Sequence, residues 1–253
     1  MTWQKSHLSL ALFLVGELVL TAALPTPLWA QTVAATPSTT IPRRSVVRVT
    51  FDPPGDGTPS DTAGGASRGG CPDDSPAINP PITPLKPINH SGLTVAEHPT
   101  FFVYVPQTVA QKAIFILKDK EEDYFYQKTI SIPRTAGVVS VKLPDDAPAL
   151  ESGKTYKWSF IMMCGQAVRP DSPVAEGQIQ RIEPNPELLR QLKNLSPLER
   201  AALYGKNGLW YDTLASLAEQ MRSQPNDSTL LSTWEKLLQS VGLEAIATKP
   251  LLQ

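Results

Sequence analysis

The chain has 253 residues, and its 23 lysines and arginines against 24 aspartates and glutamates leave a formal net charge of −1. Hydrophobic residues make up 41% and charged residues 19%, close to the average for soluble globular proteins. This balance excludes a basic nucleic-acid binder, an acidic disordered tail protein and a polytopic membrane protein. The one basic cluster, Arg43, Arg44 and Arg48, lacks an interleaved aromatic stripe, so no nucleic-acid partner is expected.

The first segment, residues 1–30, has the features of a secretory signal peptide. Lys5 supplies a weak positive charge, Leu8–Leu24 is an apolar run, and a small residue precedes the expected cleavage position. The alternatives are an uncleaved membrane anchor or the apolar start of a cytosolic protein. A spanning helix needs about 20 mainly apolar residues, and this run carries Glu17 and breaks at Pro25. We expect export to the periplasm, outer envelope or extracellular space, with membrane contact only through a retained signal.

The two cysteines, Cys71 and Cys164, are expected to form one disulfide in an oxidising compartment. The bond would close a loop of about 90 residues and, in the chain-entropy model, contribute on the order of 4 kcal/mol. A catalytic thiol or a metal pair is the alternative. Neither cysteine has a neighbouring Cys or His at metal-ligand spacing, so no metal or other cofactor is expected.

Residues 31–92 hold 11 of the 25 prolines and 7 of the 15 glycines. Such a segment buries too few apolar side chains to offset the loss of backbone entropy, so it is expected to be mostly disordered. One strand is predicted at 45–51, where a short β-type run precedes a Pro-Pro turn. The glycine-rich stretch 64–71 is followed by Pro72 and by no Lys-Ser/Thr pair, so we expect a flexible segment pinned by the disulfide rather than a phosphate-binding loop.

Residues 93–183 are predicted to form a β-domain. Short apolar runs are separated by turn residues at intervals of about 8–15 residues, and their side chains alternate as in half-buried strands. Six or seven strands in about 90 residues predict an antiparallel sandwich rather than βαβ units. The predicted strands lie at 101–105, 113–117, 124–132, 139–143, 155–162 and 178–182.

One local pattern specifies the type of sandwich. The segment 150–158 resembles the tyrosine corner of immunoglobulin-like and fibronectin-type-III domains, in which a tyrosine hydroxyl bonds to upstream backbone. Tyr156 and Trp158 are therefore expected in the core. The predicted fold class is α+β, an immunoglobulin/fibronectin-III-like antiparallel sandwich followed by a small C-terminal helical region.

Residues 185–253 are predicted to be that helical region. Helix starts are indicated by Asn185 before a proline, by a capping box at Ser196–Glu199, and by Asp227 after a proline turn. The stretch 204–225 resembles one tetratricopeptide-like helical hairpin, but no second copy follows at the repeat period. We expect a helical cap packed on the sandwich.

Three consecutive apolar residues, Leu209, Trp210 and Tyr211, are the candidate interaction surface of this cap. Two interpretations remain: contacts within the core or between the domains, or an exposed groove that binds a peptide. An exposed apolar patch of several hundred Å² around them would favour the groove.

Candidate catalytic residues are sparse, so we expect no enzyme. Beyond the signal the chain has only His90 and His98 as general bases for a serine or cysteine nucleophile, and it has no G-x-S-x-G motif. The acidic pairs Asp73-Asp74 and Asp145-Asp146 follow prolines, which is typical of turns. The acidic tip at 119–123 lacks the spacing of a calcium loop. The alternative is a secreted hydrolase that acts on envelope sugars or peptides through Asp or Glu.

A family resemblance rests on several segments in order. Together they resemble a cyanobacterial domain-of-unknown-function family, number nine hundred and twenty-eight, across roughly residues 46–252. The resemblance implies an exported protein of the cyanobacterial envelope and no established activity, so no functional residues are carried over. We expect a non-catalytic interaction module whose partner is an unknown protein or envelope component. The segments are 48–54, 64–71, 99–106, 153–160, 180–182 and 203–212.

Overall fold

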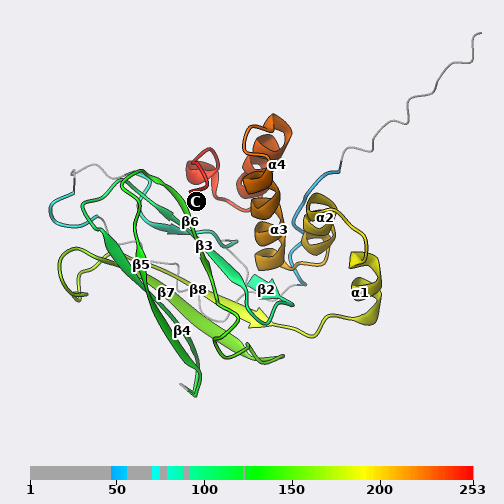
Figure 1. Cartoon of the computed structure of the whole chain (residues 1–253), viewed down its shortest axis with the longest axis horizontal. Coiled ribbons are helices and arrows are strands. Elements are labelled where there is room, and N and C mark those ends of the chain that lie inside the picture. The colour runs from blue at the N-terminus through cyan, green and yellow to red at the C-terminus, as the bar shows by residue number, and fades with distance from the viewer. Residues whose placement is uncertain (1–46, 56–69, 75–78, 88–91, 122, 253) are drawn as a thin grey trace, which may run out of the picture. The chain divides into compact units, whose positions relative to one another are not determined.

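The computed structural model describes residues 47–55, 70–74, 79–87, 92–121 and 123–252. Across these residues the chain is a mixed α and β protein with two β-sheets and four α-helices (Figure 1). The predicted signal at 1–30, His90, the pair Arg43 and Arg44, and most of the glycine-rich stretch lie outside the described residues. None of the described helices is long and apolar enough to cross a bilayer.

The smaller sheet has three antiparallel strands in the order β1-β3-β6: Thr83–Pro84, Thr100–Val105 and Gly137–Lys142. The C-terminal segment runs along the outer edge of β6. Val138 donates its N–H to the Pro250 carbonyl at 2.7 Å, and Leu252 donates to the Val138 carbonyl at 2.8 Å. This edge of the smaller sheet is therefore hydrogen-bonded to the chain's own tail.

The larger sheet has the strand order β2-β8-β7-β4-β5. Three of its pairings are antiparallel, but β2 and β8 run parallel. The sheet is thus mixed, whereas the sequence predicted purely antiparallel pairing. Alternation along a strand determines which side chains share a face, but it carries no information about the direction of the neighbouring strand. The strands are Gly92–Thr94, Val174–Arg181, Thr155–Met163, Lys112–Asp119 and Phe125–Ser131.

The core lies between the inward faces of the two sheets. Phe101 of β3 lies with its ring centroid 4.9 Å from that of Phe115 on β4 and 5.6 Å from that of Trp158 on β7. Tyr156 is fully buried, and its hydroxyl accepts a hydrogen bond from the backbone N–H of Glu151 at 2.8 Å. The upstream backbone bond predicted for this tyrosine is therefore present.

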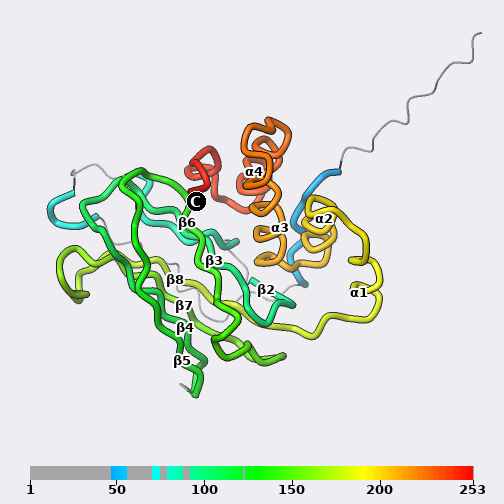
Figure 2. The backbone as a smooth tube through the Cα atoms, viewed as in Figure 1, coloured from blue at the N-terminus to red at the C-terminus, as the bar shows by residue number. Residues whose placement is uncertain are grey.

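The helices follow β8 without a further strand (Figure 2). The helix starts predicted from Asn185, Ser196 and Asp227 are capped N-termini, because each of these side chains accepts a hydrogen bond from a backbone N–H in the first helical turn. The helices are α1 (Pro186–Leu192), α2 (Pro197–Lys206), α3 (Trp210–Ser223) and α4 (Ser228–Gln239), followed by the 3₁₀ helix η1 (Glu244–Ile246).

The strand expected at 45–51 has no counterpart in the described part of that segment. Residues 50–52 lie against α2 instead of a sheet edge, and Asp52 donates its N–H to the Gly205 carbonyl at 3.0 Å. A Cβ on Gly205 would lie 2.0 Å from the Thr50 carbonyl oxygen, so glycine allows this close approach. A helix cannot offer the ladder of partners that a strand requires, so the β-type run stays outside both sheets.

Candidate functional site

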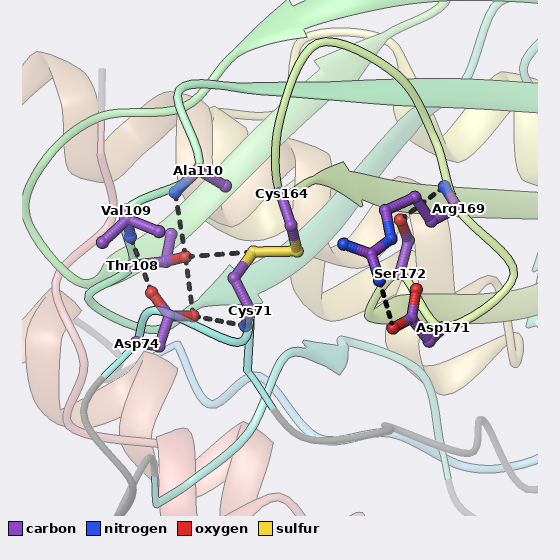
Figure 3. Close-up of a disulfide and its surroundings, with 9 residues drawn as sticks. All are labelled: Cys71, Asp74, Thr108, Val109, Ala110, Cys164, Arg169, Asp171 and Ser172. Atoms are coloured by element: carbon purple, nitrogen blue, oxygen red, sulfur yellow. Dashed lines mark hydrogen bonds and ion pairs between the residues drawn. A yellow bond between two sulfur atoms is a disulfide. The ribbon is translucent and has the colours of Figure 1, made fainter.

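The predicted disulfide between Cys71 and Cys164 is confirmed, with the two Cα atoms 5.3 Å apart (Figure 3). It ties the segment before β1 to the end of β7, and it indicates an oxidising compartment. Asp74 holds the same turn, accepting hydrogen bonds from the Cys71 N–H at 2.6 Å, the Thr108 hydroxyl at 2.9 Å and the Val109 N–H at 2.7 Å. One of the carboxylates considered for catalysis therefore has a structural role.

The other candidate catalytic groups are dispersed. Asp145 forms an exposed ion pair with Lys142 at 3.4 Å. The buried Asp119 accepts a hydrogen bond from the Tyr124 N–H at 3.1 Å. His98 places Nε2 3.0 Å from the Ala147 carbonyl oxygen. The described residues contain no cluster of three or more His, Cys, Asp or Glu that could hold a metal ion.

The candidate interaction surface is buried. Leu209, Trp210 and Tyr211 are each at most 1% exposed. A partner cannot reach these side chains in the folded chain, so the exposed-groove interpretation needs correction and the core interpretation describes them. The physical reason is their place at the start of α3, the helix that contacts β2 and β3. The apolar rings that suggested a groove fill the space between this helix and the sheets.

The first turn of α3 is hydrogen-bonded to three separate parts of the sheets. Trp210 donates its indole N–H to the Leu85 carbonyl, just after β1, at 2.8 Å. Tyr211 accepts the indole N–H of Trp158 at 2.8 Å and donates its hydroxyl to the Gln178 carbonyl at 3.0 Å. We call Trp210, Tyr211 and Asp212 the helix anchor.

Asp212 is the third member of the anchor, and sequence reasoning missed it. Its carboxylate accepts the Val95 N–H, just after β2, at 3.1 Å. Burial raises the pKa of Asp212 to about 6, although hydrogen bonds from Thr94 and the local backbone favour the charged form. An acidic residue in the first turn of a helix is common for dipole reasons alone, so the sequence carried no signal for this contact.

β2 approaches the anchor closely because it begins with glycine. A Cβ on Gly92 would lie 2.2 Å from the Tyr211 ring. Tyr211 also packs against Phe101, with centroids 5.5 Å apart, so its ring is enclosed by strands of both sheets. The anchor is therefore tightly packed, and each of its three side chains is hydrogen-bonded to the sheets or to the segments that flank them.

Among the described residues, the opposite face of the larger sheet stays partly exposed. Ile114, Ile161 and Val174 are direct cross-strand neighbours on β4, β7 and β8, and each is half-buried. Their neighbours along the strands point inward and are fully buried, as Phe115 and Phe160 are. We call Ile114, Ile161 and Val174 the outer row. It forms a continuous apolar strip on a face that solvent reaches.

β5 forms one edge of the same sheet. The bonds from the Ile132 N–H to the Gln111 carbonyl, at 2.9 Å, and from the Asp119 N–H to the Tyr124 carbonyl, at 3.3 Å, set the phase of its pairing with β4. Hydrogen-bonded pairs alternate in an antiparallel ladder, so the even-numbered residues of β5 bond to β4. The odd-numbered residues direct their backbone N–H and C=O groups away from it.

We call these outward groups the β5 edge. Phe125 is 58% exposed, and within the described residues no strand pairs with this side of β5. Neither the outer row nor the β5 edge was singled out from the sequence, because alternation alone does not show which face remains uncovered or which strand ends a sheet. The β5 edge consists of Phe125, Gln127, Thr129 and Ser131.

No curated protein matches this chain. The family described as Domain of Unknown Function (DUF928) matches residues 63–251, a span that includes both sheets and all four helices. Because this match covers well over half of the chain, the protein belongs to the Domain of Unknown Function (DUF928) family.

Proposed function

We propose that this protein is an exported, non-catalytic binding module that holds a partner protein or envelope component on the open side of its larger sheet. The outer row carries the proposal. Ile114, Ile161 and Val174 lie side by side on three strands and stay partly exposed. Covering them would remove apolar area from water, at about 25 cal/mol per Å².

The setting of this function follows from the disulfide and from the sequence. A bond between Cys71 and Cys164 is in keeping with an oxidising compartment. The signal-like segment 1–30 supports export to the periplasm, outer envelope or extracellular space. The resemblance noted in the sequence supports a cyanobacterial envelope as the setting.

The scaffold in this proposal is an immunoglobulin- or fibronectin-III-like sandwich. Ring contacts of Phe101 with Phe115 and Trp158 support face-to-face packing of two sheets. The bond from the Glu151 N–H to the Tyr156 hydroxyl supports a tyrosine corner. Such sandwiches commonly bind partners through faces and edges while the core remains structural.

The polar groups around the core also favour binding over catalysis. The carboxylates of Asp74 and Asp212 accept hydrogen bonds from backbone N–H groups, and these bonds hold loops and helices in place. The alternative, a secreted hydrolase that uses Asp or Glu on envelope sugars or peptides, stays a prediction that no contact between these carboxylates favours.

A charge placed in the outer row tests the proposal. The oxidised full chain and its Ile161→Lys variant are each used to capture proteins from an envelope extract, with quantification by mass spectrometry. Thr155→Lys is the matched control, because it adds the same charge to an exposed position of the same strand, outside the row. We expect specific partners to fall about tenfold or more with Ile161→Lys, since 1.4 kcal/mol of binding energy is a factor of ten, and to be retained with Thr155→Lys. Equal recovery with both variants would contradict the proposal.

A further inference from the structure

We infer that the β5 edge is a docking site for an extended segment of a partner protein, which adds to the larger sheet as a sixth strand and carries an acidic side chain between two apolar ones. This inference rests on the proposed function as a binding module, and it adds a second contact at the edge of the same sheet and the chemistry of the segment that binds there. Its elements are the main chain of β5, the side chains on its inner face, and the charge at its centre.

The main chain of β5 specifies an extended partner. Phe125, Gln127, Thr129 and Ser131 direct their N–H and C=O groups away from β4. These groups form a row that only another strand satisfies with the correct spacing. Among the described strands this edge is distinctive. The outer edge of β6 is hydrogen-bonded to Pro250 and Leu252. The other two edge strands, β1 and β2, have only two and three residues, which is too short for an extended partner.

The side chains on the inner face of β5 specify what the partner carries. Tyr126 and Ile130 are half-buried and pack against the core, and Lys128 lies exposed between them. A strand beside β5 would place alternate side chains opposite these three. Two apolar side chains would extend the core over Tyr126 and Ile130, and an acidic side chain would pair with Lys128. Each such cross-strand pair would stabilise the added strand.

The charge at the centre of β5 also disfavours a second copy of this chain. Lys128 is the middle residue of the seven in β5. Antiparallel pairing of two copies over the full strand would place Lys128 opposite Lys128, and like charges directly opposite are destabilising. A shifted register would avoid this contact but would lose paired residues. The geometry therefore favours a different protein with an acidic centre.

The test uses a surface-display library of randomised peptides with the length of β5, seven residues, selected on the oxidised full chain. We expect enrichment of sequences with Asp or Glu between two apolar residues at alternating positions. Selection on Lys128→Glu should replace the central acidic residue with Lys or Arg. Absence of enrichment, or the same enriched sequences on both chains, would overturn the inference.

A proline substitution separates edge docking from adhesion elsewhere. Thr129→Pro removes an N–H that points away from β4, so the β4 ladder stays intact, and proline is tolerated on such an edge. Thr129→Val keeps the N–H and is the matched control. Peptides enriched on the unmodified chain should bind Thr129→Pro about tenfold or more weakly and Thr129→Val equally well. Undiminished binding to Thr129→Pro would refute edge docking.

Two further outcomes distinguish this inference from the proposed function. If envelope partners are lost with Ile161→Lys but retained with Thr129→Pro, the binding module stands and the docking strand does not. If the full chain forms a dimer that Thr129→Pro dissociates, the edge binds a second copy and the inferred partner is wrong.

Discussion

The two faces of strand β7 differ in burial and in what they contact. On the inner face, Trp158 is fully buried, and its indole N–H bonds to Tyr211 of the helix anchor. On the outer face, Ile161 lies between Ile114 and Val174 and remains partly exposed. The inner face thus joins the helices to the sheets, whereas the outer face stays partly exposed among the described residues. One alternating strand therefore serves stability on one side and, in the function proposed above, binding on the other.

The anchor should show the largest effect. Tyr211→Ala removes a buried ring and should lower the free energy of unfolding by about 3–5 kcal/mol. Tyr211→Phe keeps the ring but leaves the Trp158 indole N–H without its acceptor, and should cost about 1–3 kcal/mol. Denaturant unfolding measures both changes. Equal costs for the two variants would mean that the hydroxyl, not the ring, holds the helix to the sheets.

Loss of the disulfide should have the second largest effect on the free energy of unfolding. Replacing both Cys71 and Cys164 with serine should lower the free energy of unfolding by about 2–5 kcal/mol. The protein isolated from its native compartment should also migrate differently on reducing and non-reducing gels. Two freely alkylatable thiols in that protein would contradict an oxidising location.

The buried carboxyl group of Asp212 in the helix anchor should make the free energy of unfolding depend on pH. The pKa of Asp212 is raised from 3.8 to about 6, so the folded chain binds this proton more tightly than the unfolded chain. The free energy of unfolding should therefore fall as the pH rises between these two values, by about 1–3 kcal/mol from this group. Asp212→Asn should remove this part of the profile in urea titrations. If the difference in the free energy of unfolding between the two proteins changed with pH in the opposite direction, a group other than Asp212 would bind this proton.

Substitutions on the β5 edge should have the smallest effect on the free energy of unfolding. Phe125→Ala removes a ring that is 58% exposed and should change the free energy of unfolding by no more than about 0.5 kcal/mol. The same substitution at the fully buried Phe115 should cost about 3–5 kcal/mol. Thermal unfolding of the two variants provides the comparison, and similar losses for both would show that β5 is covered rather than open.

The sequence was informative where a local pattern has one physical cause. Alternation from Tyr156 to Met162 predicted a half-buried strand, and these residues lie on β7. Ser196 and Glu199 predicted a capping box, and both of its hydrogen bonds are present. The cysteine pairing followed because the chain has only two cysteines.

Apart from the disulfide, features that depend on contacts between distant segments were not predictable. Asp212 bonds to Val95, which is 117 residues away, and its own neighbours resemble any helix start. The burial of Leu209, Trp210 and Tyr211 depends on which sheet elements cover them. The partial exposure of the outer row depends on the order of strands, and a single sequence without relatives carries no signal for that order.

The contrast between the buried helix anchor and the β5 edge is tested most directly by amide and indole hydrogen exchange, followed by NMR on the oxidised full chain. The account predicts slow exchange for the Trp158 and Trp210 indole N–H groups and for the even-numbered amides of β5, and fast exchange for Phe125, Gln127, Thr129 and Ser131. Slow exchange at these four amides in the free protein, or fast exchange at the two indoles, would contradict it.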